Sequence, residues 1–375
     1  MRRRFDDARG LVLASYGSVP ARSVPTGAPH ENYQYRRVYP TGPLYSNVVG
    51  YPAHFYGTAV AEHTCNTFLG VHEEPAQALG QLLETPGTTT DDLTLTVMPL
   101  LQRLAAHVLA AVPDTNKDAA ITVSVKTSAV LAMHSNPTYA NNALATPTAA
   151  KDEAAGRKDR GKPDHEGFVA YPSMATFETF APGSTFKVAT SSAVYNLKPA
   201  LGNVAFRIAG CTTRGAIPET SKVICNDATA PKAASPCGGT MIQMLPESCH
   251  PGYAELGLAI GGTTLYEQAE VGFDQMPRID LVFPPGGVSK SNCPTPVLAP
   301  QGRLGLPGVA LSAFGQETVS ATDLQSAMVA QGIANKGVVM TPRVMAEIRN
   351  AASGLVSATS RRSSRTRSRR RQPRA

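Results

Sequence analysis

FAPGSTFKVAT, residues 180–190, contains an S-x-x-K motif that runs from Ser184 to Lys187 directly after a Pro-Gly turn. On a helix, residues i and i+3 lie on one face, so the spacing brings the Lys187 amine within hydrogen-bond reach of the Ser184 hydroxyl. A Ser hydroxyl is a weak nucleophile until a neighbouring base takes its proton, and a Lys held neutral by burial can be that base. The tetrapeptide alone also fits a solvent-facing Ser and Lys on an ordinary helix, so the flanking residues decide between these interpretations.

The residues around Ser184 resemble the nucleophile segment of class B penicillin-binding proteins, which reads very nearly Y-P-P-G-S-T-F-K-V. Residues 308–342, which contain Gly315 and Gln316, are similar to the family's helix-and-turn block. The stretches DLTLTVMPLLQRLA (92–105) and VKTSAVLAMHSNPTY (125–139) are similar to the segments that open the transpeptidase domain. YRRVYPTGPLYSNVVGY (35–51) resembles the N-terminal module of the actinobacterial penicillin-binding protein A group. The resemblance runs in colinear order over residues 5–350.

This resemblance implies an α/β fold, the serine β-lactamase-like fold of penicillin-binding transpeptidases, with an N-terminal β-rich module. We expect the module at residues 1–90, the transpeptidase domain at 91–350, and an Arg/Ser-rich disordered tail at 351–375. The implied activity is peptidoglycan D,D-transpeptidation. Ser184 would attack the penultimate D-Ala carbonyl of a stem peptide with Lys187 as base, and the amine of a second stem peptide would resolve the acyl-enzyme into a crosslink. β-Lactams would acylate Ser184 as substrate mimics, and neither a cofactor nor a metal is implied.

A second family motif, S-x-N, is matched by Ser248-Cys249-His250 before the helical stretch GYAELGLAIGG. The resemblance gives Ser248 the role of relaying a proton to the leaving amine. His250 stands where the family has Asn, and a neutral imidazole offers its one donor and one acceptor in a different geometry. The resemblance also places His250, Gly315 and Gln316 among the substrate-binding residues. The alternative is that residues 246–250 are only a loop before a helix.

The third family motif, K-[ST]-G, does not occur in this sequence. Lys126-Thr127-Ser128 comes nearest, but it lies between two strand-like runs, 121–125 and 129–134, and is interpreted as a hairpin turn. After about Ile348 the sequence becomes ASGLVSATSRRSSRTRSRRRQPRA, which has no apolar period. We therefore expect a truncated or frameshifted C-terminal end that lacks the later strands of the sheet, and impaired activity.

Charge, cysteine content and hydropathy indicate which partners and which cell compartment to expect. The net charge of +7 comes from the tail, because residues 361–375 hold eight Arg and no acid, which leaves 7 − 8 = −1 elsewhere. No specific nucleic-acid partner is therefore expected. The six cysteines form no C-x-x-C pair and permit disulfides without fixing which ones pair. No transmembrane anchor is visible, whereas the family acts at the extracytoplasmic face of the cell membrane with other cell-wall and division proteins.

Three alternatives to an active transpeptidase remain. A catalytically inactive scaffold of the same family would explain His250 and the absent third motif. A D,D-carboxypeptidase or a β-lactamase would share the Ser-Lys pair, although the N-terminal module and the block around Gln316 argue against both. An Arg-rich nucleic-acid binder would rest on the tail alone, and its binding would weaken with salt.

Overall fold

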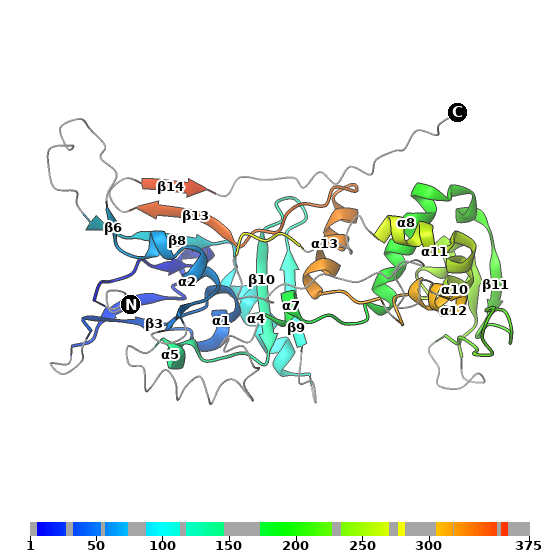
Figure 1. Cartoon of the computed structure of the whole chain (residues 1–375), viewed down its shortest axis with the longest axis horizontal. Coiled ribbons are helices and arrows are strands. Elements are labelled where there is room, and N and C mark those ends of the chain that lie inside the picture. The colour runs from blue at the N-terminus through cyan, green and yellow to red at the C-terminus, as the bar shows by residue number, and fades with distance from the viewer. Residues whose placement is uncertain are drawn as a thin grey trace. The chain divides into compact units, whose positions relative to one another are not determined.

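The computed structural model describes residues 6–27, 33–53, 57–73, 88–112, 118–145, 173–226, 234–269, 277–281, 305–317, 319–350 and 354–358. The chain divides into two compact units, shown in Figure 1. Unit 1 comprises Met1–Glu178, Arg278–Val288 and Gln331–Ser364. Unit 2 comprises Thr179–Pro277, Ser289–Ala330 and Arg365–Ala375.

Unit 1 contains a mixed four-stranded sheet in the order β1-β8-β13-β14. Strand β8 (Asp91–Leu95) pairs in parallel with β1 (Val12–Leu13) and antiparallel with β13 (Met345–Asn350). Alternate residues of β8 are buried, as expected for a strand with one face on a core. The pairing therefore joins segments from the two ends of the sequence around one hydrophobic core.

The hairpin predicted around Lys126-Thr127-Ser128 is confirmed. Strands β9 (Asp118–Val123) and β10 (Val130–Asn136) pair antiparallel, and residues 125–127 form the turn between them. Helix α4 (Pro99–Ala110) packs on this hairpin. The buried Gln102 side chain fixes the contact: its Nε2 donates to the Met133 carbonyl at 2.8 Å, and its Oε1 accepts the Met133 N–H at 2.9 Å.

A buried ion network connects three parts of unit 1. The Glu62 carboxylate accepts hydrogen bonds from Arg9 Nη2 at 2.9 Å and from Arg37 Nε at 2.6 Å. Burial raises the pKa of Glu62, but the positive charges and hydrogen bonds of Arg37 and Arg9 outweigh burial and bring that pKa below its ordinary value. Paired and hydrogen-bonded in this way, a charge can stay ionised inside a protein.

The expectation of a wholly disordered tail after residue 350 is wrong for Gly354–Ala358. These residues form strand β14, which pairs antiparallel with β13 in the hairpin at the top left of Figure 1. Gly354 has φ +80, the left-handed conformation that a tight turn requires and that glycine adopts at low cost. The remainder of the predicted tail, residues 359–375, lies outside the described residues.

The other elements of unit 1 are short strands and helical turns. The strands form the pairs β2 (Arg22–Pro25) with β3 (Tyr35–Val38), β4 (Pro52–Ala53) with β5 (Gly57–Thr58), and β6 (His72–Glu73) with β7 (Thr88–Thr89). The helical turns are η2 (Ser15–Gly17), η3 (Gly42–Tyr45), α1 (Ser46–Val49), α2 (Val60–Thr64), α3 (Asn66–Leu69), α5 (Asn141–Leu144) and α7 (Met174–Phe177).

Unit 2 is mostly helical. It contains η5 (Gly183–Phe186), α8 (Lys187–Leu197), η6 (Pro199–Asn203), α9 (Met241–Met244), α10 (His250–Ile260), α11 (Gly262–Ala269) and α12 (Leu306–Ser312). Helix α13 (Asp323–Ala334) begins in unit 2, and Thr322 Oγ1 caps it by accepting the Gln325 N–H at 3.2 Å. Gly261, with φ +85, ends α10 and separates it from α11.

One strand pair and two disulfides complete unit 2. Strand β11 (Phe206–Ala209) pairs antiparallel with β12 (Cys237–Gly239). Disulfides link Cys211 with Cys225 and Cys237 with Cys249, a pairing that the sequence left open. Within the part of the chain that the structure describes, no helix is both long and apolar enough to cross a membrane.

Candidate active site

The nucleophile candidate Ser184 lies in a tight turn of 3-10 helix rather than in the regular helix that the sequence predicted. Gly183 has φ +56 and starts η5, which passes directly into α8 at Lys187. A 3-10 helix has three residues per turn, so residues i and i+3 eclipse. The S-x-x-K spacing therefore aligns the two side chains even more directly than an α-helix would.

Ser184, Lys187 and Ser248 form one hydrogen-bonded cluster. Lys187 Nζ donates to Ser184 Oγ at 2.7 Å and to Ser248 Oγ at 3.0 Å. Ser248 Oγ donates to Ser184 Oγ at 2.6 Å. Ser184 is exposed, whereas Lys187 is fully buried. The arrangement presents a hydroxyl to solvent with a sheltered amine behind it and a second hydroxyl that touches both.

Two aromatic rings surround the Lys187 amine. Its Nζ lies 5.6 Å from the centroid of the Tyr253 ring and 5.6 Å from that of the Phe314 ring. Burial raises the pKa of Tyr253 to about 12, so its hydroxyl stays neutral, and it shares a 2.7 Å hydrogen bond with Ser191 on α8. The amine is thus buried next to two aromatic rings and sheltered from solvent.

The loop that carries Ser248 is held in a strained conformation. Ser248 has φ +52, which costs a non-glycine residue free energy and persists only where the surroundings impose it. The next residue, Cys249, is buried and bonded to Cys237. His250 then begins α10, and its backbone N–H donates to the buried Asn226 Oδ1 at 3.1 Å. Disulfide and hydrogen bond together fix the loop beside Ser184.

His250 lies next to Ser184, the candidate nucleophile. Its Nε2 is 3.5 Å from Ser184 Oγ. Its ring stacks on Phe314, with a centroid separation of 5.0 Å and an interplanar angle of 14°. The imidazole is therefore directed at Ser184 by a flat aromatic support, and it presents a ring nitrogen where the family presents an amide.

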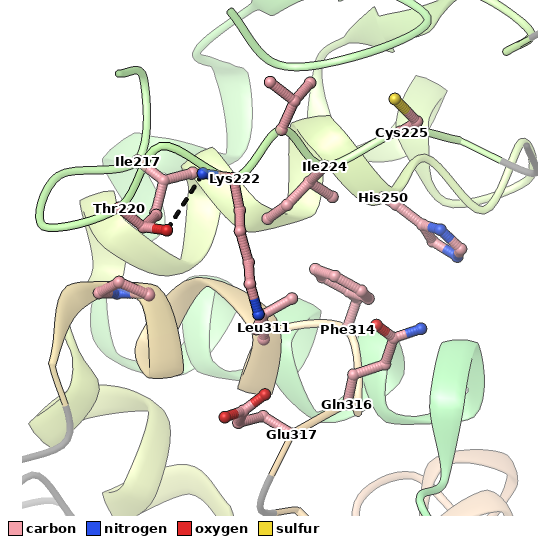
Figure 2. Close-up of a pocket in the computed structure, with 12 residues that line it drawn as sticks. Ile217, Thr220, Lys222, Ile224, Cys225, His250, Leu311, Phe314, Gln316 and Glu317 are labelled. Carbon is pink, nitrogen blue, oxygen red and sulfur yellow. Dashed lines mark hydrogen bonds between the residues drawn. The ribbon is translucent and has the colours of Figure 1, made fainter. Parts of the chain in front are cut away.

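Gly315 and Gln316 occupy different parts of the site. Gly315 packs directly against the turn that holds Ser184, because its carbonyl accepts the Gly183 N–H at 2.9 Å. Gln316 lines a pocket of about 490 Å³ together with His250 and Phe314. Figure 2 shows Gln316 and His250 on the same side of this pocket, with Phe314 between them and Leu311.

Sequence reasoning did not identify Tyr253, Phe314 or Asn226 as parts of the site. Tyr253 lies three residues after His250 on α10, and this helical spacing was the only available signal for it. Phe314 and Asn226 reach the cluster through tertiary contacts, which no local pattern predicts. No group of three or more metal-binding side chains occurs among the described residues.

Two family models match the chain. The penicillin binding protein transpeptidase domain matches residues 119–373, and the penicillin binding protein A dimerisation domain matches residues 9–85. The first match continues past residue 350, which corrects the expectation that the family likeness stops near Ile348. Strand β14 agrees with this correction.

Two curated relatives indicate the same family of proteins. The chain is 27% identical over 368 residues to the peptidoglycan D,D-transpeptidase PbpA of Mycolicibacterium smegmatis, covering 95% of this chain and 68% of that protein. It is 25% identical over 364 residues to PbpA of Mycobacterium tuberculosis, covering 92% of this chain and 66% of that protein. The chain therefore spans about two thirds of the length of these relatives.

Solved structures share the fold. A ceftriaxone acyl-enzyme complex of penicillin-binding protein A from M. tuberculosis superposes with a TM-score of 0.78 at 24% identity, covering 97% of this chain and 78% of that one. A D,D-transpeptidase domain from Eggerthella lenta superposes with a TM-score of 0.70 at 25% identity, covering 96% and 77%. With the transpeptidase model matching well over half of the sequence, this chain belongs to the penicillin-binding protein transpeptidase family.

Proposed function

We propose that this chain acts as a serine-type D,D-transpeptidase on peptidoglycan stem peptides through an acyl-enzyme at Ser184. The observation that carries the proposal is the cluster of Ser184, Lys187 and Ser248, in which an exposed hydroxyl is bonded to a buried amine at 2.7 Å and to a second hydroxyl at 2.6 Å. The names of the relatives and the acyl-enzyme complexes of penicillin-binding protein A support the same chemistry.

Each member of the cluster has a role in acylation. Burial favours the uncharged form of an amine, so Lys187 can accept the Ser184 proton as Oγ attacks the penultimate D-Ala carbonyl. Ser248, which touches both atoms, passes that proton to the nitrogen of the leaving D-Ala as the peptide bond breaks. The amine of a second stem peptide then attacks the ester, loses a proton to the same cluster and releases Ser184. A β-lactam carbonyl would be attacked in the same way.

We assign substrate positioning to His250, Gly315 and Gln316, and we expect slow turnover. The His250 ring can bond a substrate amide from its support on Phe314, but its donor and acceptor are arranged differently from those of Asn. The sequence also contains no K-[ST]-G, whose strand helps to form the oxyanion site in the family. Loss of one oxyanion donor typically costs about 10² to 10³ in rate. The expected activity is therefore measurable but well below that of relatives with all three motifs.

The proposed place of action is the extracytoplasmic face of the cell membrane, in cell-wall synthesis for growth and division. The two disulfides support this, because such bonds persist in oxidising compartments. Stem peptides and β-lactams are the proposed ligands, and other cell-wall and division proteins are the proposed partners. The match to a dimerisation domain at residues 9–85 adds a second copy of the chain to these candidates.

The test is covalent labelling with a fluorescent penicillin, followed by mass spectrometry of the labelled peptide. The adduct should map to Ser184 and disappear in Ser184→Ala. Ser192→Ala is the matched control, since Ser192 lies on α8, the helix that follows the Ser184 turn, and its hydroxyl donates to the Val188 carbonyl at 2.8 Å. Labelling that survives Ser184→Ala would show that the nucleophile is assigned wrongly. A folded protein that is never labelled would favour the inactive scaffold, the alternative that His250 and the absent third motif support.

The role of His250 is tested separately by comparing His250→Ala with His250→Asn. If the ring positions substrate, the Ala variant should acylate more slowly and the Asn variant should match or exceed the original chain, because Asn restores an amide at that point. Equal rates in all three would remove His250 from the substrate site.

A further inference from the structure

Three side chains approach the Ser184 hydroxyl. The distances to its Oγ are 2.7 Å for Lys187 Nζ, 2.6 Å for Ser248 Oγ and 3.5 Å for His250 Nε2. A hydroxyl accepts on two lone pairs and donates one proton. Lys187 and Ser248 both donate to Ser184 Oγ and so occupy the two lone pairs. The Ser184 proton is therefore left for His250, whose Nε2 accepts it when the ring carries its own proton on Nδ1.

An imidazole at position 250 can do something that an amide cannot. The amide of Asn, which the family's S-x-N motif has here, forms hydrogen bonds but does not take up a proton near neutral pH. A neutral imidazole both accepts a hydrogen bond and takes up the proton, which is why His is the side chain most often used as a general base. The sequence Ser248-Cys249-His250 therefore places a base beside Ser184 that the family motif does not provide.

Acylation of Ser184 would leave this base facing the ester. Ser184 Oγ becomes an ester oxygen without a proton, so His250 Nε2 loses the donor that it had in the free protein. The ring is held in place by its stacking on Phe314, at 5.0 Å and 14°, and by the bond from the His250 N–H to Asn226. Because His250 also lines the pocket of about 490 Å³ shown in Figure 2, water can reach the ring and replace the lost donor.

The other two members of the cluster are less suited to activating this water. Lys187 is fully buried, and its amine donates to Ser248 Oγ at 3.0 Å. Water in the pocket does not reach a fully buried amine. Ser248 carries a hydroxyl, which is not a base at neutral pH. His250 is only half-buried, so its ring is accessible to water from the pocket and lies close to the atom that carries the acyl group.

We propose that His250 gives this chain a second activity, the hydrolysis of its own acyl-enzyme. This rests on the proposed function, because the acyl group must first be attached to Ser184. His250 Nε2 takes a proton from water as the water oxygen bonds to the ester carbon. The intermediate then collapses, the bond from that carbon to Ser184 Oγ breaks, and the imidazolium returns its proton to Oγ. A stem peptide leaves as a carboxylic acid shortened by one D-Ala, and a β-lactam leaves with its ring opened.

The experiment follows the release of a fluorescent penicillin from the labelled full-length chain after excess label has been removed. General base catalysis contributes about 10² to 10⁴ in rate. His250→Asn and His250→Gln, which keep a hydrogen-bonding side chain but cannot take the proton, should therefore retain the label at least about 10² times longer. His107→Asn removes an exposed imidazole from α4 in unit 1 and should release the label at the original rate. All these variants lack the third family motif equally, so it does not affect the ratios of their rates.

Chemical rescue separates a proton acceptor from a ring that only supports the site. His250→Ala should also retain the label, and free imidazole added to this variant should restore release in proportion to its concentration. Release from the original chain should also slow in heavy water, because a proton moves from water in the step. A retained label that imidazole does not release would show that the ring has a structural role only.

Hydrolysis of a stem peptide gives a second measurement. A synthetic stem peptide that ends in D-Ala-D-Ala, with its amino groups acetylated, offers no amine to resolve the ester. The original chain should release D-Ala from it repeatedly. His250→Asn should stop after a single D-Ala for each Ser184, because the ester then persists.

The outcomes distinguish this proposal from the proposed function. A label that attaches to Ser184 of the original chain and stays there keeps transpeptidation and rejects hydrolysis. Release at the same rate in His250→Asn rejects His250 as the base. A folded chain that is never labelled rejects both, because no acyl-enzyme then exists to be hydrolysed.

Discussion

Replacing Gly315 by Ala should distort the turn that holds the nucleophile. Gly315 has φ +78, and a Cβ there would lie 2.1 Å from the Gly183 carbonyl oxygen, 2.8 Å from the Gly183 nitrogen and 2.8 Å from Phe186 Cβ. Two of these contacts are with backbone atoms, which cannot rotate away. Gly183 directly precedes Ser184, so relief of the clash has to move either the nucleophile turn or the segment that contains Gly315.

The expected loss of stability in Gly315→Ala has two contributions. A non-glycine residue at positive φ costs about 1–3 kcal/mol. Forcing an extra methyl group into a packed site costs about another 1–3 kcal/mol. Gly315→Ala should therefore lower the free energy of unfolding by about 2–6 kcal/mol. Gly215→Ala is the matched control in the same unit, because Gly215 has φ +82 but nothing within 4 Å of its Cβ position. Gly215→Ala should lose only the contribution from the positive φ, about 1–3 kcal/mol.

Urea unfolding followed by circular dichroism measures the stability of each variant, and the rate of penicillin labelling reports whether Ser184 keeps its reactive geometry. A displacement of about 1 Å at a reacting group can cost about 10² in rate. Gly315→Ala should thus label far more slowly per folded molecule than the original chain, and Gly215→Ala at an unchanged rate. Equal stability losses in the two variants, or normal labelling of folded Gly315→Ala, would refute the clash as the reason for glycine at this position.

Three further predictions concern the scaffold. Glu62→Gln leaves two buried guanidinium groups without a counter-charge and should cost about 3–5 kcal/mol in urea unfolding, whereas Glu347→Gln, in an exposed pair, should cost far less. Because the pKa of Glu62 is lowered in the folded state, its ionised carboxylate stabilises the protein above the unfolded-state pKa of about 4.3, and this stabilisation should be lost as the pH falls through the lower folded-state pKa. The free energy of unfolding of Glu62→Gln should lack this decrease at acid pH, which would confirm the assignment. Gln102→Leu removes the side-chain amide that bonds the Met133 N–H and carbonyl, and it should lower the free energy of unfolding by about 2–4 kcal/mol. A loss of less than about 1 kcal/mol would show that these two hydrogen bonds do not hold α4 on the hairpin. Replacing Cys237 and Cys249 together by Ser should slow penicillin labelling more than replacing Cys211 and Cys225, because only the first disulfide adjoins Ser248; the reverse order would contradict this.

Local patterns predicted several short-range features well. The S-x-x-K spacing placed Lys187 beside Ser184, and the hairpin around Lys126-Thr127-Ser128 formed as expected. In each case the signal and the structure lie within a few residues of each other. An α-helix was expected at Ser184 where the structure has a 3-10 turn, because Gly183 takes a positive φ that the sequence alone did not reveal.

Contacts between distant residues were not predictable in this way. The stacking of His250 on Phe314 and the bond between His250 and Asn226 join separate segments. Six cysteines allow many pairings, and spacing does not choose among them. Strand β14 was missed because its residues lack an apolar period, although Gly354 provided a turn signal; its pairing with β13 supplies the backbone hydrogen bonds that make it a strand.

The position of the site within one unit determines how its activity should be interpreted. Ser184, Lys187, Ser248 and His250 all belong to unit 2, as do the rings and the disulfide that fix them. The hydrogen bonds among Ser184, Lys187, Ser248 and His250 therefore all form within unit 2. If labelling of the unmodified chain is slow, Lys187→Ala should slow it much further, because the cluster is assembled and only the stabilisation of the oxyanion is poor. If Lys187→Ala labels at the same slow rate as the original chain, the residual reaction is uncatalysed, and the 2.7 Å contact between Lys187 and Ser184 has no part in it.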